Sequence, residues 1–229
     1  KRANEGNYAV MAINCFNIET ARAVINAAQS LRAPIIINIV QEHMVNHCDS
    51  NLIAPIVKKL AQRASVEVAL NFDHGEEIGL LKKALVDGYS SVMVDASRYN
   101  LEGNIRMTRE IVEFAQQFDA SVEGEIGCMG ASEGDNYTDD DMKTNPDEAL
   151  VLHGGSGSGD ENIKRCVEFG INKINVGCDF MNANVDSIKK HLKKDPDINY
   201  WVMMHQVEID SQELVKKYIH LSGSEGKSL

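Results

Sequence analysis

The sequence predicts an α/β fold in which parallel strands alternate with helices, and it favours a (β/α)8 barrel. Short, nearly continuous apolar runs alternate with amphipathic stretches along the chain, a pattern typical of parallel strands covered on both faces. Polar side chains cluster where these runs end, for example Asn14, Asp95 and Asn175. Functional groups at many strand ends are typical of a barrel mouth, whereas a doubly wound sheet gathers them near one switch point.

The elements follow in a regular order. The apolar runs predict strands over residues 8–15, 34–40, 66–72, 91–96, 121–126, 151–152 and 173–176. Helical spacing predicts helices over residues 19–31, 50–63, 79–86, 101–118, 160–169 and 181–193. Helical spacing also continues from 206 to 218, and the Gly/Ser-rich end beyond it is expected to fray. The acidic stretch 132–143 is expected to be a loop.

The alternation breaks before Val151. Asn145 and Pro146 are a good helix start, with an N-cap followed by proline at the first helical position. Val151 opens a buried strand only a few residues later, which leaves no room for that helix. Seven strands are found where a barrel needs eight. We therefore expect the region of the sixth strand to be missing at Leu150–Val151, either absent from the chain or passed over by the numbering.

Composition limits the classes of partner. The 229 residues are 43% hydrophobic and 25% charged, as in an ordinary globular protein, and a single domain over 1–229 is expected. The net charge of −11 argues against nucleic-acid and anionic-membrane partners but not against a small anionic substrate. Five cysteines without a CxxC pair, and no apolar run long enough to span a bilayer, favour a cytoplasmic location.

Asp73 and His74 end the third apolar run, in "NFDHGEE". Histidine is the commonest metal ligand, and a neighbouring carboxylate can act as general acid or base. Adjacent strand residues point to opposite faces unless the strand has already turned. The alternative is a turn in which Asp73 bonds to the backbone and Gly75 supplies a positive φ.

The stretch "LHGGSGSGD" carries His153 at a strand end, followed by small residues that lead into a helix. Glycines allow backbone N–H groups to approach an anion, and the loop after the seventh strand is the usual phosphate site of such barrels. A flexible turn is the alternative. A second Gly-bearing strand end, "NVGCD", favours phosphate binding.

Glu123 and Glu125 in "VEGEIG" share one face of a strand. Two carboxylates inside a barrel are costly unless they are paired or bind a metal. The alternative for Glu123 is an ion pair with Arg98 or Lys173.

The ordered set "YAVMAIN", "FDHG", "SVMVDAS", "VEGEIGCMG", "LHGGSG" and "INKINVGCD" resembles the class II, metal-dependent aldolase family. The resemblance runs nearly end to end and includes the tail "VKKYIHLSGSEGK". It implies a (β/α)8 barrel that reversibly cleaves a ketose bisphosphate, such as fructose or tagatose 1,6-bisphosphate, to dihydroxyacetone phosphate and an aldehyde. It also implies a zinc ion, a possible Na⁺ or K⁺ ion, and a homodimer or homotetramer.

The resemblance implies roles for particular residues. Asp73 is expected to be the acid/base at the C4 hydroxyl, and Glu133 a loop carboxylate that transfers a proton at the ketone-derived carbon. Metal positions are expected at His74, His153, Asp95 and Glu125. Substrate and phosphate contacts are expected at Asn14, Gly154, Ser156, Asn175, Gly177 and Cys178. The third zinc histidine of the family would lie on the missing sixth strand.

Other mechanisms remain open at this stage. Zn²⁺ held by imidazoles would stabilise an enediolate as a Lewis acid. A lysine Schiff base would need a lysine at the barrel mouth, and Lys173 instead opens its strand. A non-catalytic phosphosugar-binding barrel, or a metal-free isomerase that shares only the phosphate site, are the alternatives to an aldolase.

Overall fold

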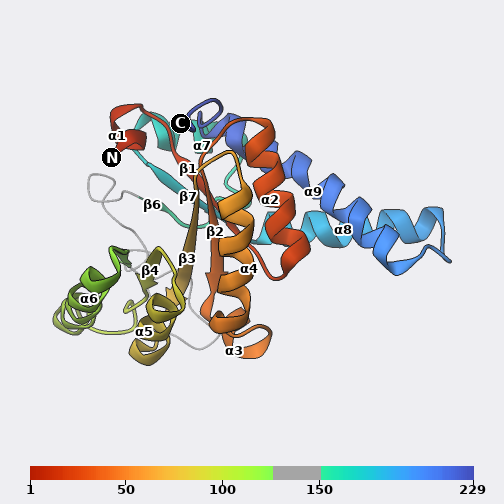
Figure 1. Cartoon of the computed structure of the whole chain (residues 1–229). Helices are drawn as coiled ribbons and strands as arrows, with labels where there is room; N and C mark the ends of the chain where they lie inside the picture. Colours follow the sequence, from red (N-terminus) through yellow and green to blue (C-terminus); the bar gives the residue numbers. More distant parts are fainter. Residues whose placement is uncertain (126–150) are drawn as a thin grey trace. The chain divides into compact units, whose positions relative to one another are not determined.

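Seven strands are present among residues 1–125 and 151–229, which are the residues that the computed structural model describes (Figure 1). They are β1 (Val10–Asn14), β2 (Ile35–Val40), β3 (Val68–Gly75), β4 (Ser91–Val94), β5 (Ser121–Gly124), β6 (Val151–Leu152) and β7 (Lys173–Val176). All seven predicted strands are therefore found, and β6 is the one predicted as the seventh strand of a barrel. The predicted helix start at Asn145 and the predicted loop 132–143 lie outside the described residues.

The chain divides into two units, each with its own set of strands. The first unit comprises Lys1–Asn38, Pro55–Ala69 and Leu150–Leu229, and the second comprises Ile39–Ala54 and Leu70–Ala149. Strands of the first unit lie in the order β6-β7-β1-β2, and those of the second in the order β3-β4-β5. The pairings of β1 with β2 and β7, of β3 with β4, of β4 with β5 and of β6 with β7 are all parallel. Parallel strands joined by helical crossovers are the predicted arrangement.

The helices agree with the amphipathic stretches. They are α1 (Arg2–Glu5), α2 (Ile18–Ser30), α3 (Gln41–Asn46), α4 (Ser50–Arg63), α5 (Ile78–Asp87), α6 (Leu101–Ala115) with the 3₁₀ turn η1 (Gln116–Phe118), α7 (Asp160–Glu168), α8 (Cys178–Lys194) and α9 (Tyr200–Leu221). The short α1 and α3 were not predicted, because one helical turn carries no measurable periodicity. Local chemistry fixes several ends: Asn17 and Thr20 form a reciprocal capping box on α2, and Gly88 ends α5 in the left-handed conformation.

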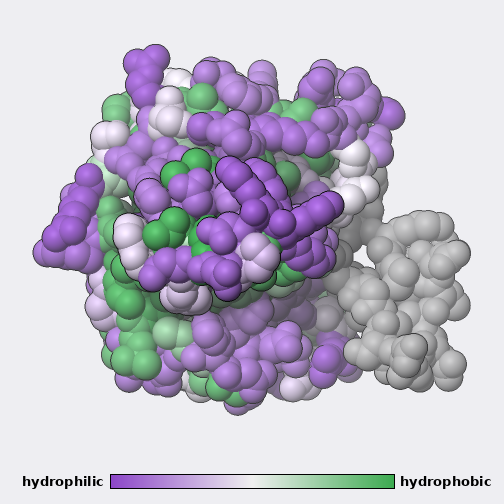
Figure 2. All heavy atoms as spheres, turned by 90° about the vertical axis from the view of Figure 1, so that its right-hand side faces the viewer, coloured by the Kyte–Doolittle hydropathy of each residue, from purple (hydrophilic) through white to green (hydrophobic). Residues whose placement is uncertain are grey.

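In the first unit the core lies between the strands and helices α2, α8 and α9. Helix α9 packs along α2 and α8, and α8 and α9 extend together as a helical hairpin (Figure 1). The central strand β1 is fully buried at Met11, Ala12 and Ile13. Figure 2 looks onto the side of the molecule at the right of Figure 1, where the exposed surface is mainly hydrophilic with scattered apolar side chains. Among the described residues, no helix combines the length and apolarity needed to cross a membrane.

The expectation that the C-terminal end frays is wrong. Ser222 and Ser224 are fully buried, and their hydroxyl groups bond to each other at 2.9 Å. The backbone amides of Gly226 and Ser228 donate to the carbonyl groups of Leu31 and Arg32, both at 2.9 Å. Both hydroxyl groups also donate to the Ile219 carbonyl of α9, so the buried polar groups of this tail have hydrogen-bond partners.

Candidate active site

The strand β3 ends in an irregularity that determines how Asp73 and His74 are placed. The register between β3 and β4 shifts between Phe72 and Gly75, and His74 adopts a φ of 49°. A left-handed conformation is uncommon for a non-glycine residue, and such strain inside a strand is found mostly at functional sites. The strand therefore turns at His74, which was one of the two possibilities that the sequence left open.

Gly75 has a different role from the one considered in the turn interpretation. Its φ is not positive, since the left-handed residue is His74. A Cβ atom on Gly75 would lie 2.4 Å from Leu81 Cδ2 and 2.8 Å from Phe72 Cε1. Glycine is needed at this position for close packing rather than for its backbone freedom.

His74 lies between two carboxylates of the second unit. Its Nδ1 atom is 3.0 Å from Asp95 Oδ2, directly after β4, and 3.5 Å from Glu125 Oε2, directly after β5. Ligand atoms of these three residues all lie within 4.8 Å of one another, which is close enough to share one metal ion. One imidazole nitrogen and two carboxylate oxygens are a donor set that suits Zn²⁺, so the residues present fit a divalent metal.

The carboxylates also change the protonation of His74. Burial opposes the charged imidazolium, but the hydrogen bond to Asp95 and the charges of Asp73, Glu125 and Asp95 raise the pKa of His74 to about 9. Burial likewise opposes ionisation of Asp95, yet hydrogen bonds from His74 and Ser97 lower its pKa to about 2. Without a metal, this pair is a charged imidazolium and a carboxylate, so the second unit concentrates negative charge around one cationic group.

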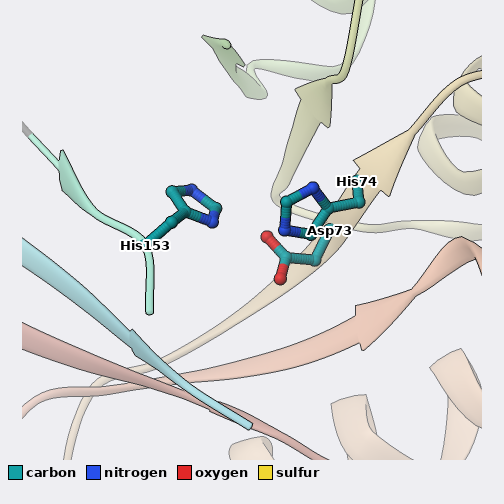
Figure 3. A group of neighbouring side chains, drawn as sticks. All are labelled: Asp73, His74 and His153. Carbon is teal, nitrogen blue, oxygen red and sulfur yellow. The ribbon is translucent and has the colours of Figure 1, made fainter. Parts of the chain in front are cut away.

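Asp73 precedes His74 and is almost completely buried, with 1% of its surface exposed. Asn71 Nδ2 lies 3.4 Å from one of its carboxylate oxygens. A buried carboxylate with an amide partner is kept away from bulk water, which suits a group that exchanges protons with a substrate rather than with solvent. Figure 3 shows Asp73 and His74 on β3, together with His153, which follows β6.

The first unit brings together the predicted phosphate-binding residues. The side-chain amide of Asn175 lies 3.2 Å from His153 Nδ1, and the backbone amide of Gly155 donates to the Asn175 carbonyl at 3.0 Å. A Cβ atom on Gly155 would lie 2.8 Å from that carbonyl, so only glycine fits. Gly154 has a φ of 74°, which folds the loop sharply after His153.

The first turn of α8 closes the other side of this loop. The hydroxyl of Ser156 accepts a hydrogen bond from the amide of Asp179 at 3.0 Å. Gly177 precedes the helix, and a Cβ atom there would lie 2.7 Å from Nδ2 of Asn14. Cys178 is the first helical residue and is exposed. The loop and the start of α8 thus meet at one place, and a Gly-rich loop beside a helix N-terminus is a common construction of an anion site.

Two residues considered in the sequence analysis are not found in the described part of this site, and one residue of the site was not predicted. Glu133 lies outside the described residues. Arg98, considered as a partner for Glu123, has its Nη1 atom 3.5 Å from Glu76 Oε2. Asn38 was not predicted, although it is fully buried and its amide lies 3.4 Å from Asn14 Oδ1. A polar residue inside the apolar run "IIINIV" was the signal that could have identified it.

The sequence matches the family described as class II fructose-bisphosphate aldolase over residues 1–150 and again over 148–227. The chain therefore belongs to the class II fructose-bisphosphate aldolase family. This is a family of carbon–carbon lyases of carbohydrate metabolism that depends in general on zinc.

Individual relatives extend this result over nearly the whole chain. The D-tagatose-1,6-bisphosphate aldolase subunit GatY of Klebsiella oxytoca is 28% identical over 273 residues, which cover 99% of this chain and 96% of that protein. The YdjI aldolase of Escherichia coli K12 superposes with a TM-score of 0.85 at 26% identity, over 99% of this chain and 96% of that one. The fructose-bisphosphate aldolase of Campylobacter jejuni has the same fold, with a TM-score of 0.83 at 20% identity over 99% and 93% of the two chains. The predicted α/β, TIM-barrel type of fold is thereby confirmed.

The comparisons also bear on the break at Leu150–Val151. The two parts of the family match meet at residues 148–150. The alignment with GatY extends over 273 residues although the chain has 229, so at least 44 aligned positions have no residue here. The family match is thus divided at the same place in the sequence where the alternation of strands and helices breaks.

Proposed function

We propose that this chain is a metal-dependent aldolase that reversibly cleaves a ketose bisphosphate, such as fructose or tagatose 1,6-bisphosphate, to dihydroxyacetone phosphate and an aldehyde. Family membership supports the reaction type, and the relative named as a tagatose-bisphosphate aldolase subunit supports the substrate class. The main observation behind the proposal is that His74 lies within 3.5 Å of both Asp95 and Glu125, which follow the neighbouring strands β4 and β5.

His74 would hold the metal ion, with Asp95 and Glu125 beside it, and His153 is proposed as a second imidazole ligand. Because Asp95 bonds to Nδ1 of His74, we assign it here to orienting the imidazole, which would leave Nε2 for the metal, rather than to binding the metal itself. When bound, Zn²⁺ would supply a Lewis acid for the negative charge that develops on the substrate carbonyl oxygen. A monovalent cation near the phosphate is a further part of the proposal.

Asp73 would move the proton that cleavage requires. As the C3–C4 bond breaks, its electron pair passes to the C3 side, which becomes an enediolate, and the C4 hydroxyl becomes the aldehyde carbonyl. The hydroxyl proton would go to the Asp73 carboxylate, whose burial keeps it from exchanging with water. Glu133 would then return a proton to C3, which completes dihydroxyacetone phosphate.

The first unit would bind the phosphate of the dihydroxyacetone half. Gly154 and Ser156 would contact the phosphate from the loop after β6. Gly177 and Cys178 would contact it from the start of α8. Asn175 and Asn14 would orient the substrate hydroxyl and carbonyl groups through their side-chain amides, which both donate and accept hydrogen bonds. Anchoring this end would restrict the position of the C3–C4 bond during the reaction.

A coupled assay with fructose and tagatose 1,6-bisphosphates, with and without a chelator, tests this function. We expect cleavage that is lost on chelation and restored by Zn²⁺. Cleavage that continues at an unchanged rate without metal would contradict the mechanism. A homodimer or homotetramer and a cytoplasmic location are proposed from the family and from the unpaired cysteines among the described residues, Cys15, Cys48, Cys166 and Cys178.

A second function is a phosphosugar-binding barrel without catalysis. It is favoured by the division of the family match at residues 148–150, because the third zinc histidine was expected on a sixth strand that would lie there. The metal content of the purified protein separates the two functions. Stoichiometric zinc together with turnover identifies the aldolase, whereas phosphate binding without either identifies the binding protein.

A further inference from the structure

Two adjacent residues near the end of α9 contact the helices on both sides of the phosphate loop. Lys217 Nζ lies 2.7 Å from Oδ1 of Asp160, the first residue of α7. The Tyr218 hydroxyl donates to Oδ2 of Asp179, in the first turn of α8, at 2.5 Å. Helix α7 begins directly after the Gly-rich loop, and α8 carries the amide that binds Ser156. The end of α9 thus contacts the first turns of the two helices that flank the loop.

The contact made by Tyr218 is the more buried of the two. Only 3% of Tyr218 is exposed, whereas the Lys217–Asp160 pair lies at the surface. Burial and the adjacent Asp179 carboxylate raise the pKa of Tyr218 well above its usual range, so the phenol remains a hydrogen-bond donor at neutral pH. A surface ion pair contributes little, whereas a buried hydrogen bond to a carboxylate contributes more.

Asp179 connects Tyr218 to the loop through two different groups. Its carboxylate accepts the phenol hydrogen, and its backbone amide donates to Ser156 Oγ at 3.0 Å. The N-cap of α8 is Gly177, which makes no side-chain cap hydrogen bond. Asp179 therefore links the end of α9 to the loop through its carboxylate and its amide together.

A fixed position of Ser156 is important for the conformation of the loop, because the glycines around it restrict the backbone very little. Gly154, Gly157 and Gly159 all have positive φ values, between 74° and 81°. A Gly-rich segment loses much conformational entropy when it is fixed. The hydrogen bond from Asp179 to Ser156 is therefore one of the restraints that order this loop, together with the bonds from Gly155 to the Asn175 carbonyl and from Ser158 Oγ to the Gly154 carbonyl.

We propose that Tyr218 is a positioning residue for the phosphoryl group of the substrate, acting through Asp179 and Ser156 on the Gly154–Ser158 loop. The inference rests on the proposed function insofar as it assigns this loop to a phosphate. Tyr218 itself does not touch the substrate. Its removal should weaken phosphate binding and leave the chemical step nearly unchanged.

The test is calorimetric binding of inorganic phosphate to the whole protein, with Tyr218→Phe compared with a control, Tyr200→Phe. Tyr200 opens the same helix and is 73% exposed, so its hydroxyl is not expected to matter. We expect Tyr218→Phe to weaken phosphate binding several-fold. About tenfold is the upper limit, because the hydrogen bond that is removed is to a charged group but does not itself contact the phosphate. In the aldolase assay the same variant should raise KM with kcat nearly unchanged. Equal phosphate affinity in Tyr218→Phe and wild type would overturn the proposal.

A double-mutant cycle separates positioning from folding. Ser156→Ala removes the acceptor in the loop without altering the packing of α9. It should weaken phosphate binding at least as much as Tyr218→Phe, because Ser156 is also a proposed phosphate contact. The double variant should bind phosphate no more weakly than the single variant with the lower affinity, because both substitutions interrupt the same series of contacts from Tyr218 through Asp179 to Ser156. Additive losses of phosphate affinity would show that the two residues act independently and would overturn the proposal. If Tyr218→Phe does not fold, a normal phosphate affinity of Ser156→Ala would overturn it instead. Phosphate binding requires no turnover, so the inference can be tested even where the aldolase assay fails. A wild-type protein that cleaves the bisphosphates but binds no inorganic phosphate would overturn this inference while leaving the proposed reaction intact.

Discussion

The Nδ1 atom of His74 lies 3.0 Å from Oδ2 of Asp95, so a residue that follows β4 orients a histidine of β3. Asp95 is in turn fixed by Ser97, whose hydroxyl donates to its other oxygen at 2.6 Å. This chain of contacts sets which nitrogen of His74 is available to a metal ion. It makes Asp95 the residue whose removal should be most informative about the metal site.

Replacing Asp95 by alanine should weaken zinc binding by about 10–100-fold, the usual effect of losing a carboxylate that orients a metal-binding histidine. Competition with a chromophoric zinc chelator measures the affinity. Glu110→Gln is a matched control, because it removes a carboxylate of the same unit that pairs with Lys82 at the surface. Unchanged zinc affinity in Asp95→Ala would show that Asp95 does not support the metal.

The left-handed backbone of His74 leads to a prediction that needs no metal. At a φ of 49°, alanine is strained whereas glycine is not, so His74→Gly should be more stable than His74→Ala by about 1 kcal/mol. Denaturant unfolding of the two metal-free variants measures the difference. The same pair of substitutions at Glu113, an exposed residue inside α6, should give the opposite order, because alanine is the better helix former there. If the alanine variant has the larger free energy of unfolding at both His74 and Glu113, the positive φ of His74 is not a property of the folded protein.

Gly177 and Asn14 should be energetically coupled. A Cβ atom on Gly177 would lie 2.7 Å from Asn14 Nδ2, so Gly177→Ala should force the amide away and cost about 1–3 kcal/mol of stability. Adding Asn14→Ala should recover part of that loss, because the atom that clashes is then removed. Gly79→Ala is the control, since nothing lies within 4 Å of a Cβ there. Thermal unfolding of the four proteins measures the coupling, and purely additive changes would contradict the close contact.

The strand ends were predictable because their signals are local. Apolar runs, and the polar residues that follow them, predict that Asp73, Asp95, Glu125 and His153 lie at strand ends. The turn of β3 at His74 was not predictable in the same way. A register shift depends on how β3 pairs with β4, and that pairing is a tertiary property which no spacing of residues in one strand encodes.

Longer-range partners were missed for a similar reason. Tyr218 and Asp179 are 39 positions apart, and nothing in either segment indicates that the phenol donates to that carboxylate. The fixed C-terminal tail was mispredicted because Gly- and Ser-rich composition usually indicates mobility. Here Glu67, more than 150 positions away in the sequence, accepts hydrogen bonds from Ser228 Oγ and from the amide of Leu229.

The attachment of this tail should depend on pH through Glu67. Burial opposes ionisation of Glu67, but hydrogen bonds from Ser228 and Arg2 lower its pKa from an ordinary 4.5 to about 2. Because the pKa in the folded protein lies below the unfolded value, the interaction contributes fully above about pH 4.5 and is lost as the pH falls toward 2. Hydrogen-exchange protection of the Gly226 and Ser228 amides should therefore decrease across this range while amides of β1 remain protected. Glu67→Gln should show low protection in the tail already at neutral pH, with Glu113→Gln as the control. Tail protection in Glu67→Gln equal to that of the wild type would show that the backbone bonds to Leu31 and Arg32 fix the tail without Glu67.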